Sequence, residues 1–387
     1  VLTHNVMILV IVQVFYRATP VPFRFSRGTV DIGAYEAGRS VICVTTTNDE
    51  FNGLTTGGVS LREAVDYANT NWEAITICLP TGVYSLTISG SGGISQGDLD
   101  VTGNVTIVGD GPGLSVIDAG GIATDERIFD VANVLDLSGV TLTLGDARSV
   151  SLERNGGAIR VKNGGHLDLS YSTIAANDTG RRGFGGGIYF DATATGMIEA
   201  CVITVNTADN EGGGVYIESG TGAITLKSTI IANNSDSESS TPDIIVGAGR
   251  PFVTAGYNRF TSYSGFMLHE TDYLATGPVH YVVTSIADTY DGSNDPVNMS
   301  LRDAIDQANN APGAQEIWLP AWEFRLTRDG TDAGAPNVSI GDLDVTEDLT
   351  IRGIDLATKV DASGIVDAAF DQIGGALLTL LNVAVIN

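Results

Sequence analysis

The sequence predicts an all-β protein, a right-handed parallel β-helix with short amphipathic capping helices. Three glycine-led segments, which begin at Gly156, Gly186 and Gly213, recur with a period of 27 to 30 residues. Self-similarity at such a period is typical of solenoids. Apolar residues alternate with polar ones inside each segment, which indicates strands rather than helices. Glycine, asparagine and aspartate separate these short runs, so we expect three strands in each turn of the coil.

Equivalent positions of successive coils are expected to lie above one another. The inward-facing stacks are Ile159, Ile188 and Val215, then Val161, Phe190 and Ile217. A second apolar run in each coil ends in an isoleucine that is followed three residues later by an asparagine, in the pairs Ile174 and Asn177, Ile203 and Asn206, and Ile231 and Asn234. The three asparagines predict a ladder whose side-chain amides hydrogen-bond along the coil axis.

A longer repeat of about 240 residues overlies the short one. Ser-Leu-Arg-Glu-Ala at 60–64 recurs as Ser-Leu-Arg-Asp-Ala at 300–304, and Gly-Asp-Leu-Asp-Val at 97–101 recurs at 341–345. Ser60 and Ser300 are expected to cap short helices, with Glu63 and Asp303 at the third helical position, where a carboxylate can bond back to the cap. For Glu63 this pattern predicts a capping box. We interpret these helices as end-caps that cover the open end of a strand stack.

The duplication divides the chain into three parts. Residues 1–38 are expected to be the tail of a preceding module that ends in residues 31–36, from Asp31 to Glu36. Residues 39–279 form a complete module, and residues 280–387 begin a second, incomplete one. Because an unfinished coil exposes unpaired backbone groups, the sequence predicts a piece of a longer tandem array or a subunit that stacks head-to-tail into a filament. An intact monomer is the third alternative.

The residues 60–64 and 300–304 resemble the CSLREA domain of bacterial surface proteins, with Val59 and Met299 at the position of that family's leading cysteine. Residues 31–36 are similar to the closing motif of choice-of-anchor (Q-type) surface proteins, which carry β-helix repeats of the pectin-lyase-like kind. The glycine-led coils show weaker similarity to polymorphic outer-membrane autotransporter passengers. The resemblance covers most of the chain and implies an exported protein at the cell surface or outside the cell. It implies no catalytic residues.

Composition limits the classes of partner. The chain has 46 acidic and 20 basic residues and a formal net charge of −26, which disfavours nucleic acid and anionic membranes, since phosphate binding needs clustered Lys and Arg. The apolar run at residues 6–15 is too short to span a bilayer as a helix, and its Val and Ile content favours a buried strand. Cys78 and Cys201 lie in apolar strand patterns, and with Cys43 they make an odd number, which predicts buried free thiols.

Alternation places Arg160, Tyr189 and Tyr216 outward on one strand face, with Asp191 and Glu218 just beyond them. Aromatic faces beside carboxylates can hold a sugar, so this strip is a candidate glycan-binding site. Cross-strand packing of tyrosines would give the same pattern. Asp191 and Glu218, one coil spacing of about 4.8 Å apart, could also be the carboxylate pair of a retaining glycosidase. Neither residue lies in a motif of the pectin-degrading hydrolases.

Paired aspartates suggest calcium. Asp98 with Asp100, and Asp342 with Asp344, place two carboxylates on one side of a strand, and acidic loops near Asp49 and Asp288 add to them. Calcium prefers such oxygen clusters, although aspartates also end strands and form Asx turns. The sequence predicts no other cofactor.

The sequence therefore favours an extracellular structural or adhesive β-helical protein over a polysaccharide hydrolase or lyase on the same fold. Its expected partners are identical subunits or neighbouring modules of a longer chain, together with surface glycans. Nucleic-acid binding and membrane insertion are not expected.

Overall fold

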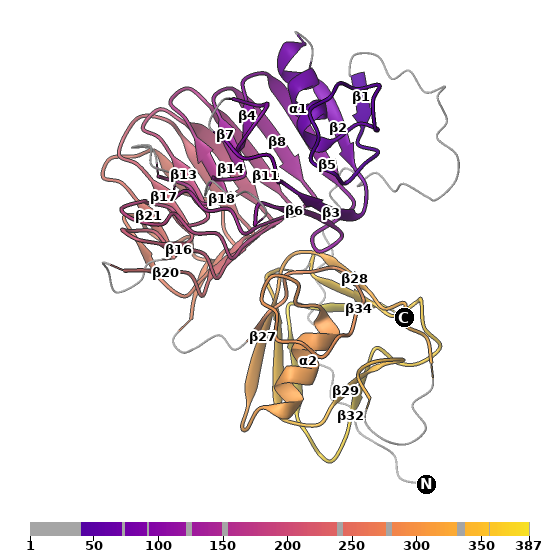
Figure 1. Cartoon of the computed structure of the whole chain (residues 1–387). Helices are drawn as coiled ribbons and strands as arrows, with labels where there is room; N and C mark the ends of the chain where they lie inside the picture. Colours follow the sequence, from indigo (N-terminus) through magenta and orange to yellow (C-terminus); the bar gives the residue numbers. More distant parts are fainter. Residues whose placement is uncertain are drawn as a thin grey trace. The chain divides into compact units, whose positions relative to one another are not determined.

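The computed structural model describes residues 40–71, 74–90, 93–120, 126–148, 154–237, 243–275, 281–330, 337–355 and 357–386. The predicted β-helix is confirmed, because parallel strands stack as a solenoid of about 10 turns (Figure 1). The predicted strand at residues 6–15 and the motif from Asp31 to Glu36 lie outside the described residues. So do residues 276–280, where the predicted boundary between the two modules falls.

Three parallel sheets, here named A, B and C, run through the coils of residues 40–275. Sheet A contains β1 (Ser40–Cys43), β2 (Ile75–Leu79), β5 (Asn104–Gly109), β8 (Val134–Ser138), β11 (His166–Ser170), β14 (Thr195–Glu199), β18 (Ile224–Lys227) and β22 (Phe252–Thr254). Sheet B contains β3 (Gly82–Ser85), β6 (Ser115–Asp118), β9 (Thr141–Thr143), β12 (Thr173–Ala175), β15 (Val202–Thr204), β19 (Ile230–Ala232), β23 (Arg259–Phe260) and β25 (Tyr273–Leu274). Sheet C contains β4 (Leu99–Val101), β7 (Phe129–Val131), β10 (Ile159–Val161), β13 (Ile188–Phe190), β17 (Val215–Ile217), β21 (Ile244–Val246) and β24 (Tyr263–Ser264).

Smaller sheets complete the strand set. A two-stranded sheet pairs β16 (Thr207–Ala208) with β20 (Ser235–Asp236) at one corner of the coil. The strands of residues 281–386 form three separate parallel sheets. The first contains β26 (Tyr281–Val282), β27 (Gln315–Leu319), β30 (Leu349–Gly353) and β33 (Leu378–Leu381). The second contains β28 (Glu323–Arg325), β31 (Lys359–Asp361) and β34 (Ala384–Ile386), and the third contains β29 (Leu343–Val345) and β32 (Phe370–Gln372).

The strand register confirms the inward stacks. Ile159 lies opposite Ile188, which lies opposite Val215, and the stack of Val161, Phe190 and Ile217 runs beside it. All six side chains are 0% exposed. Each coil thus contributes aliphatic or aromatic side chains to one continuous core, whose burial drives folding.

The repeated glycines meet two separate requirements. Gly185 has a φ of +68°, a left-handed conformation that glycine adopts without steric cost. Gly186 follows it, and a Cβ atom there would lie 2.2 Å from the carbonyl oxygen of Gly213 in the next coil. The Gly-Gly pair therefore combines a tight corner with a close approach of two coils.

The asparagine ladder is confirmed. The side-chain amide of Asn177 donates to Oδ1 of Asn206 at 2.9 Å, and that of Asn206 donates to Oδ1 of Asn234 at 2.9 Å. Asn234 in turn donates to Oδ1 of Asp243 at 3.0 Å. Asp243 is 0% exposed and accepts from the backbone N–H groups of Thr261 and Ser262. The ladder thus ends at Asp243, whose carboxyl oxygens accept hydrogen bonds from Asn234, Thr261 and Ser262.

Both predicted helices are present, α1 (Leu61–Thr70) and α2 (Leu301–Asn310). Ser60 and Glu63 form the complete capping box, whereas Asp303 accepts a hydrogen bond from the hydroxyl of its cap, Ser300, at 2.6 Å. The apolar face of α1 packs against β2, β4 and β5 beside the first coil (Figure 1). Neither helix is long and apolar enough to cross a membrane, and the described residues contain no other helix.

The prediction of a buried free thiol is wrong for Cys78 and is confirmed for Cys201. Cys43 and Cys78 form a disulfide, with Cα atoms 4.6 Å apart. The two residues are direct neighbours across β1 and β2, although they are 35 positions apart in sequence, and only the strand register shows that they meet. Cys201 is a buried free thiol, and burial raises its pKa to about 12.

Candidate functional site

The tyrosines of the predicted glycan strip meet, but they cover each other. Tyr189 lies opposite Tyr216 in the register, and their rings stack with centroids 5.6 Å apart and planes 3° apart. Phe184 packs against Tyr216 at 4.8 Å. Tyr189 is consequently only 6% exposed, and burial raises the pKa of both phenols. Glycan binding on this strip stays a prediction, and little of the Tyr189 ring is open to a ligand.

Asp191 is held in an ion pair. The Arg160 guanidinium donates from Nε to Oδ1 at 3.1 Å and from Nη2 to Oδ2 at 3.2 Å. Asp191 is 6% exposed, and the buried guanidinium of Arg250 donates to the backbone carbonyls of Asp191 at 3.0 Å and Glu218 at 3.1 Å. A bidentate pair holds a carboxylate in a fixed orientation. This arrangement is sufficient to explain Asp191 as a structural residue, and catalysis with Glu218 stays a prediction.

In the first module, arginine and lysine side chains accompany the predicted calcium ligands. The Arg127 guanidinium lies 3.7 Å from Asp98 and 3.2 Å from Asp130, and the Lys162 ammonium lies 2.6 Å from Asp130. Asp130 faces Asp100 across β4 and β7. Burial, with the neighbouring carboxylates, raises the pKa of Asp98 to about 7 although Arg127 opposes the shift. A cation bound here would have to compete with Arg127 and Lys162, neither of which the sequence pattern had linked to these acids.

The second module repeats these carboxylates with a different neighbour. Asp342, Asp344 and Asp371 each place an oxygen within 4.8 Å of the others. Asp371 faces Asp344 across β29 and β32, as Asp130 faces Asp100. In the first module, Arg127 lies two residues before Phe129. The equivalent position in the second module, two residues before Phe370, is occupied by Ala368 instead of an arginine. These three aspartates are the described residues that could hold Ca²⁺, whose preferred ligands are oxygens. Asp371 was missed, although its match to Asp130 in the duplication could have revealed it.

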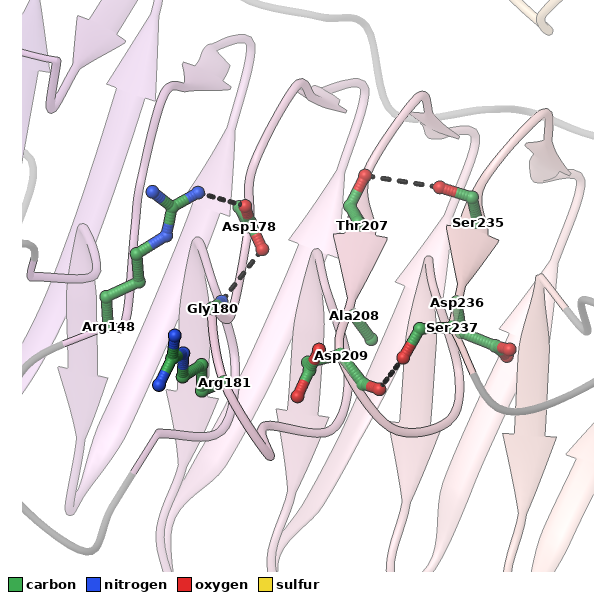
Figure 2. A pocket seen from close by; sticks show the side chains of 10 residues that line it. All are labelled: Arg148, Asp178, Gly180, Arg181, Thr207, Ala208, Asp209, Ser235, Asp236 and Ser237. Atoms are coloured by element: carbon green, nitrogen blue, oxygen red, sulfur yellow. Dashed lines mark hydrogen bonds and ion pairs between the residues drawn. The ribbon is translucent and has the colours of Figure 1, made fainter.

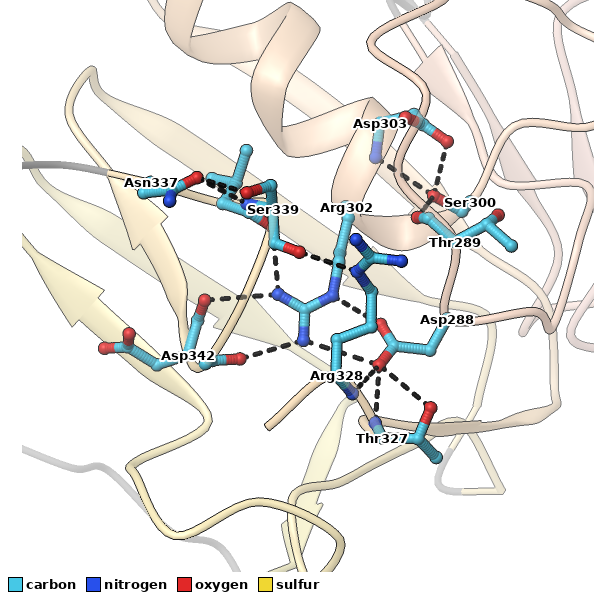
Figure 3. Close-up of polar contacts among 12 residues, drawn as sticks. Asp288, Thr289, Ser300, Arg302, Asp303, Thr327, Arg328, Asn337, Ser339 and Asp342 are labelled. Atoms are coloured by element: carbon cyan, nitrogen blue, oxygen red, sulfur yellow. Dashed lines mark hydrogen bonds and ion pairs between the residues drawn. The ribbon is translucent and has the colours of Figure 1, made fainter. Parts of the chain in front are cut away.

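A buried arginine fixes the backbone beside this cluster (Figure 3). Arg302 is 0% exposed and donates to Oδ1 of Asp288 at 2.5 Å, the carbonyl of Val338 at 2.9 Å and that of Gly341 at 2.8 Å. Arg62 makes the same set of contacts to Asp49, Ile94 and Gly97 in the first module. Asp49 and Asp288, added to the calcium candidates from sequence, are thus the partners of buried arginines. We name each Arg–Asp unit the arginine clasp.

A polar groove lies at the corner that follows the asparagine ladder (Figure 2). Its volume is about 400 Å³. Four successive coils line it, with Arg148 from the first, Asp178, Gly180 and Arg181 from the second, Thr207, Ala208 and Asp209 from the third, and Ser235, Asp236 and Ser237 from the fourth. The paired strands β16 and β20 contribute four of these lining residues, Thr207, Ala208, Ser235 and Asp236. This groove was not predicted from the sequence, because its residues share no motif and meet only through coil stacking.

Comparison with known proteins gives no relative, since no protein-family model, curated protein or solved structure matches the chain.

Proposed function

We propose that the chain is a structural and adhesive part of an exported protein, located at the cell surface or outside the cell. The Cys43–Cys78 disulfide is the observation that carries this proposal. Disulfides form and persist in oxidising compartments and are rare in the reducing cytosol. Cys43 is exposed, so cytosolic reductants would reach this bond.

The coil architecture suits a structural role. The aliphatic stacks, the asparagine ladder and the parallel strand ladders repeat the same contacts from coil to coil, so each coil is stabilised by its neighbours. The side chains at the corners of such a coil are held at a fixed spacing of about 4.8 Å. A surface of this kind can present a regular row of polar groups to a ligand, which is the property that an adhesive protein requires.

Protease treatment of intact cells that produce the protein tests this proposal. We expect an antibody against the chain to detect its degradation while a cytosolic marker in the same cells stays intact, or to detect the chain in the medium. If the chain were protected as completely as the cytosolic marker until the cells are lysed, the proposed location would be wrong.

A further inference from the structure

We propose that the polar groove between Arg148 and Ser237 binds a linear saccharide in which only some of the sugars carry a carboxylate. The inference rests on the proposed surface function, for which it supplies the adhesive ligand. It places that ligand at the corner beyond the asparagine ladder, away from the tyrosine strip that the sequence predicts.

Positive charge gathers at one end of the groove, where an anionic group of the ligand can bind. Residues 148–182 contain six basic residues, Arg148, Arg154, Arg160, Lys162, Arg181 and Arg182, against three acidic ones, Glu153, Asp168 and Asp178, in a chain whose net charge is −26. Arg160 and Lys162 are engaged by Asp191 and Asp130. Arg148 and Arg181 line the groove together with Asp178, Asp209 and Asp236, so its positive charge is confined to the end that the two arginines form.

Arg148 is held in place yet remains accessible to a ligand. Its Nη2 lies 2.6 Å from Oδ2 of Asp178 and its Nε 3.2 Å from Oδ2 of Asp146, while 53% of the side chain stays exposed. Arg181 in the next coil is exposed, and it lies with Arg148 at one end of the groove (Figure 2). A planar guanidinium matches a carboxylate with two parallel hydrogen bonds. These two arginines are the predicted contact for the ligand's acidic sugar.

The opposite end of the groove suits hydroxyl groups. Thr207 and Ser235 carry hydroxyls 3.2 Å apart on β16 and β20, and Asp209 and Asp236 add carboxylates. A backbone N–H, that of Arg182, holds Oδ2 of Asp209 at 2.6 Å. Ionised carboxylates only accept hydrogen bonds, so this end favours a ligand with O–H donors and repels further anionic groups.

Size and chemistry together select the ligand class. A volume of about 400 Å³ lies within the usual range of small-ligand sites, about 300 to 1,000 Å³. Ala208, which is buried, carries the only apolar side chain among the lining residues. An acidic peptide would bring anionic groups toward Asp209 and Asp236 without the hydroxyl donors that these acids accept. A saccharide that alternates acidic and neutral sugars matches both ends.

Calorimetric titration of the full chain with a hyaluronan tetrasaccharide, in which glucuronate alternates with N-acetylglucosamine, tests the inference. We expect binding that weakens as salt increases. Arg181→Gln should weaken it about tenfold or more, as the loss of a charge-assisted pair predicts. Arg325→Gln is the matched control, because Arg325 is also exposed, at 53% of its side chain, but lies in β28, outside the groove lining. It should change the affinity less than about twofold.

Three further probes define the specificity. Neutral chitotetraose and fully acidic tetragalacturonate should each bind more weakly than the alternating tetrasaccharide, and so should a tetraglutamate peptide. The inference is overturned if the parent protein does not bind the alternating tetrasaccharide, if both arginine variants lose affinity equally, or if any of these three probes binds as tightly. Such results would leave the surface location standing, because protease accessibility of the chain on intact cells does not depend on this groove.

Discussion

Asn206 shows how a single side chain can specify the coil. It is 0% exposed, and its amide donates to Asn234 and to the carbonyl of Ile174, both at 2.9 Å. Its Oδ1 accepts from the backbone N–H of Asn177 at 3.0 Å and from the Asn177 amide at 2.9 Å. An asparagine has both donors and acceptors, and this position uses all of them.

Asn206→Asp should therefore destabilise the protein strongly although the two residues have the same shape. The variant removes two donors and buries a charge, so we expect the free energy of unfolding to fall by about 3 kcal/mol or more. Asn233→Asp, at an exposed position of the next coil with a φ of +59°, is the control and should cost less than about 1 kcal/mol. Urea denaturation at pH 7 measures both, and equal midpoints for the two variants would contradict the ladder's role.

Asp98 should make stability depend on pH. Its folded-state pKa is about 7 against an ordinary value of 3.8, so between these values the folded protein binds the proton more tightly than the unfolded chain does. The resulting stabilisation is fully present below about pH 4 and is lost as the pH rises through about 7. Glu63, whose pKa is lowered in the folded protein, acts in the opposite direction. The contribution of Asp98 must therefore be measured as the difference in stability between the parent and a variant that lacks this carboxyl.

We expect Asp98→Asn to remove this part of the pH dependence. Urea midpoints are measured for the parent and the variant from pH 4 to pH 8, and the midpoint of the parent should fall relative to that of the variant as the pH rises from about 4 to 7. Identical slopes for the two proteins would show that Asp98 has an ordinary pKa in the folded state.

Among the elements, each of the two capping helices is joined to the neighbouring backbone by an arginine clasp, in addition to the packing of its apolar face. Arg302 and Asp288 are 0% and 4% exposed in their side chains, and the guanidinium bonds to carbonyls near β29. Arg302→Lys keeps the charge but cannot reproduce this fork of hydrogen bonds. We expect a loss of roughly 2 kcal/mol or more and faster amide hydrogen exchange in β29 and α2. Arg325→Lys, at an exposed site, should leave both unchanged, and the same result for Arg302→Lys would contradict the clasp.

The pair β29 and β32 is where Ca²⁺ binding is predicted. Calcium should raise the melting temperature of the parent by a few degrees, since a ligand of the folded state stabilises it by mass action. Asp371→Asn should abolish this shift without unfolding the protein, because Asp371 is exposed. Asp130→Asn, the equivalent change in the first module, should leave the shift intact. A parent protein that shows neither a calorimetric signal nor a thermal shift with Ca²⁺ would make the prediction wrong.

At the scale of the whole molecule, the coil was predictable because similar apolar side chains and the ladder asparagines recur at each turn. The period places Ile159 over Ile188 before any coordinates are known, and the Ile-x-x-Asn pattern places one ladder amide over the next. The capping helices were predictable because Ser60 and Glu63 act within a few residues of each other. Local and repeated signals therefore predict this fold well.

Features that depend on contacts between residues far apart in the sequence were not predictable. Cys43 meets Cys78 only through the register of β1 and β2. Arg62 gave no sign of burial, because its partners are a distant aspartate and backbone carbonyls that no motif marks. The polar groove combines corners of four coils, and each corner has an ordinary turn sequence. The tyrosine stack was predicted correctly as a pair, yet the depth of its burial depends on Phe184, which the strand pattern does not include.

The Cys43–Cys78 disulfide bears both on the proposed export and on the strand register of the first coil. Mass-spectrometric mapping of thiols, on protein taken under alkylating conditions from cells that produce it, tests both. We predict that Cys43 and Cys78 are recovered as a linked pair of peptides, while Cys201 is recovered as a thiol that reacts only after unfolding. Recovery of Cys43 and Cys78 as separate alkylated peptides would contradict the proposed oxidising location, and a link from either of them to Cys201 would contradict the pairing of β1 with β2.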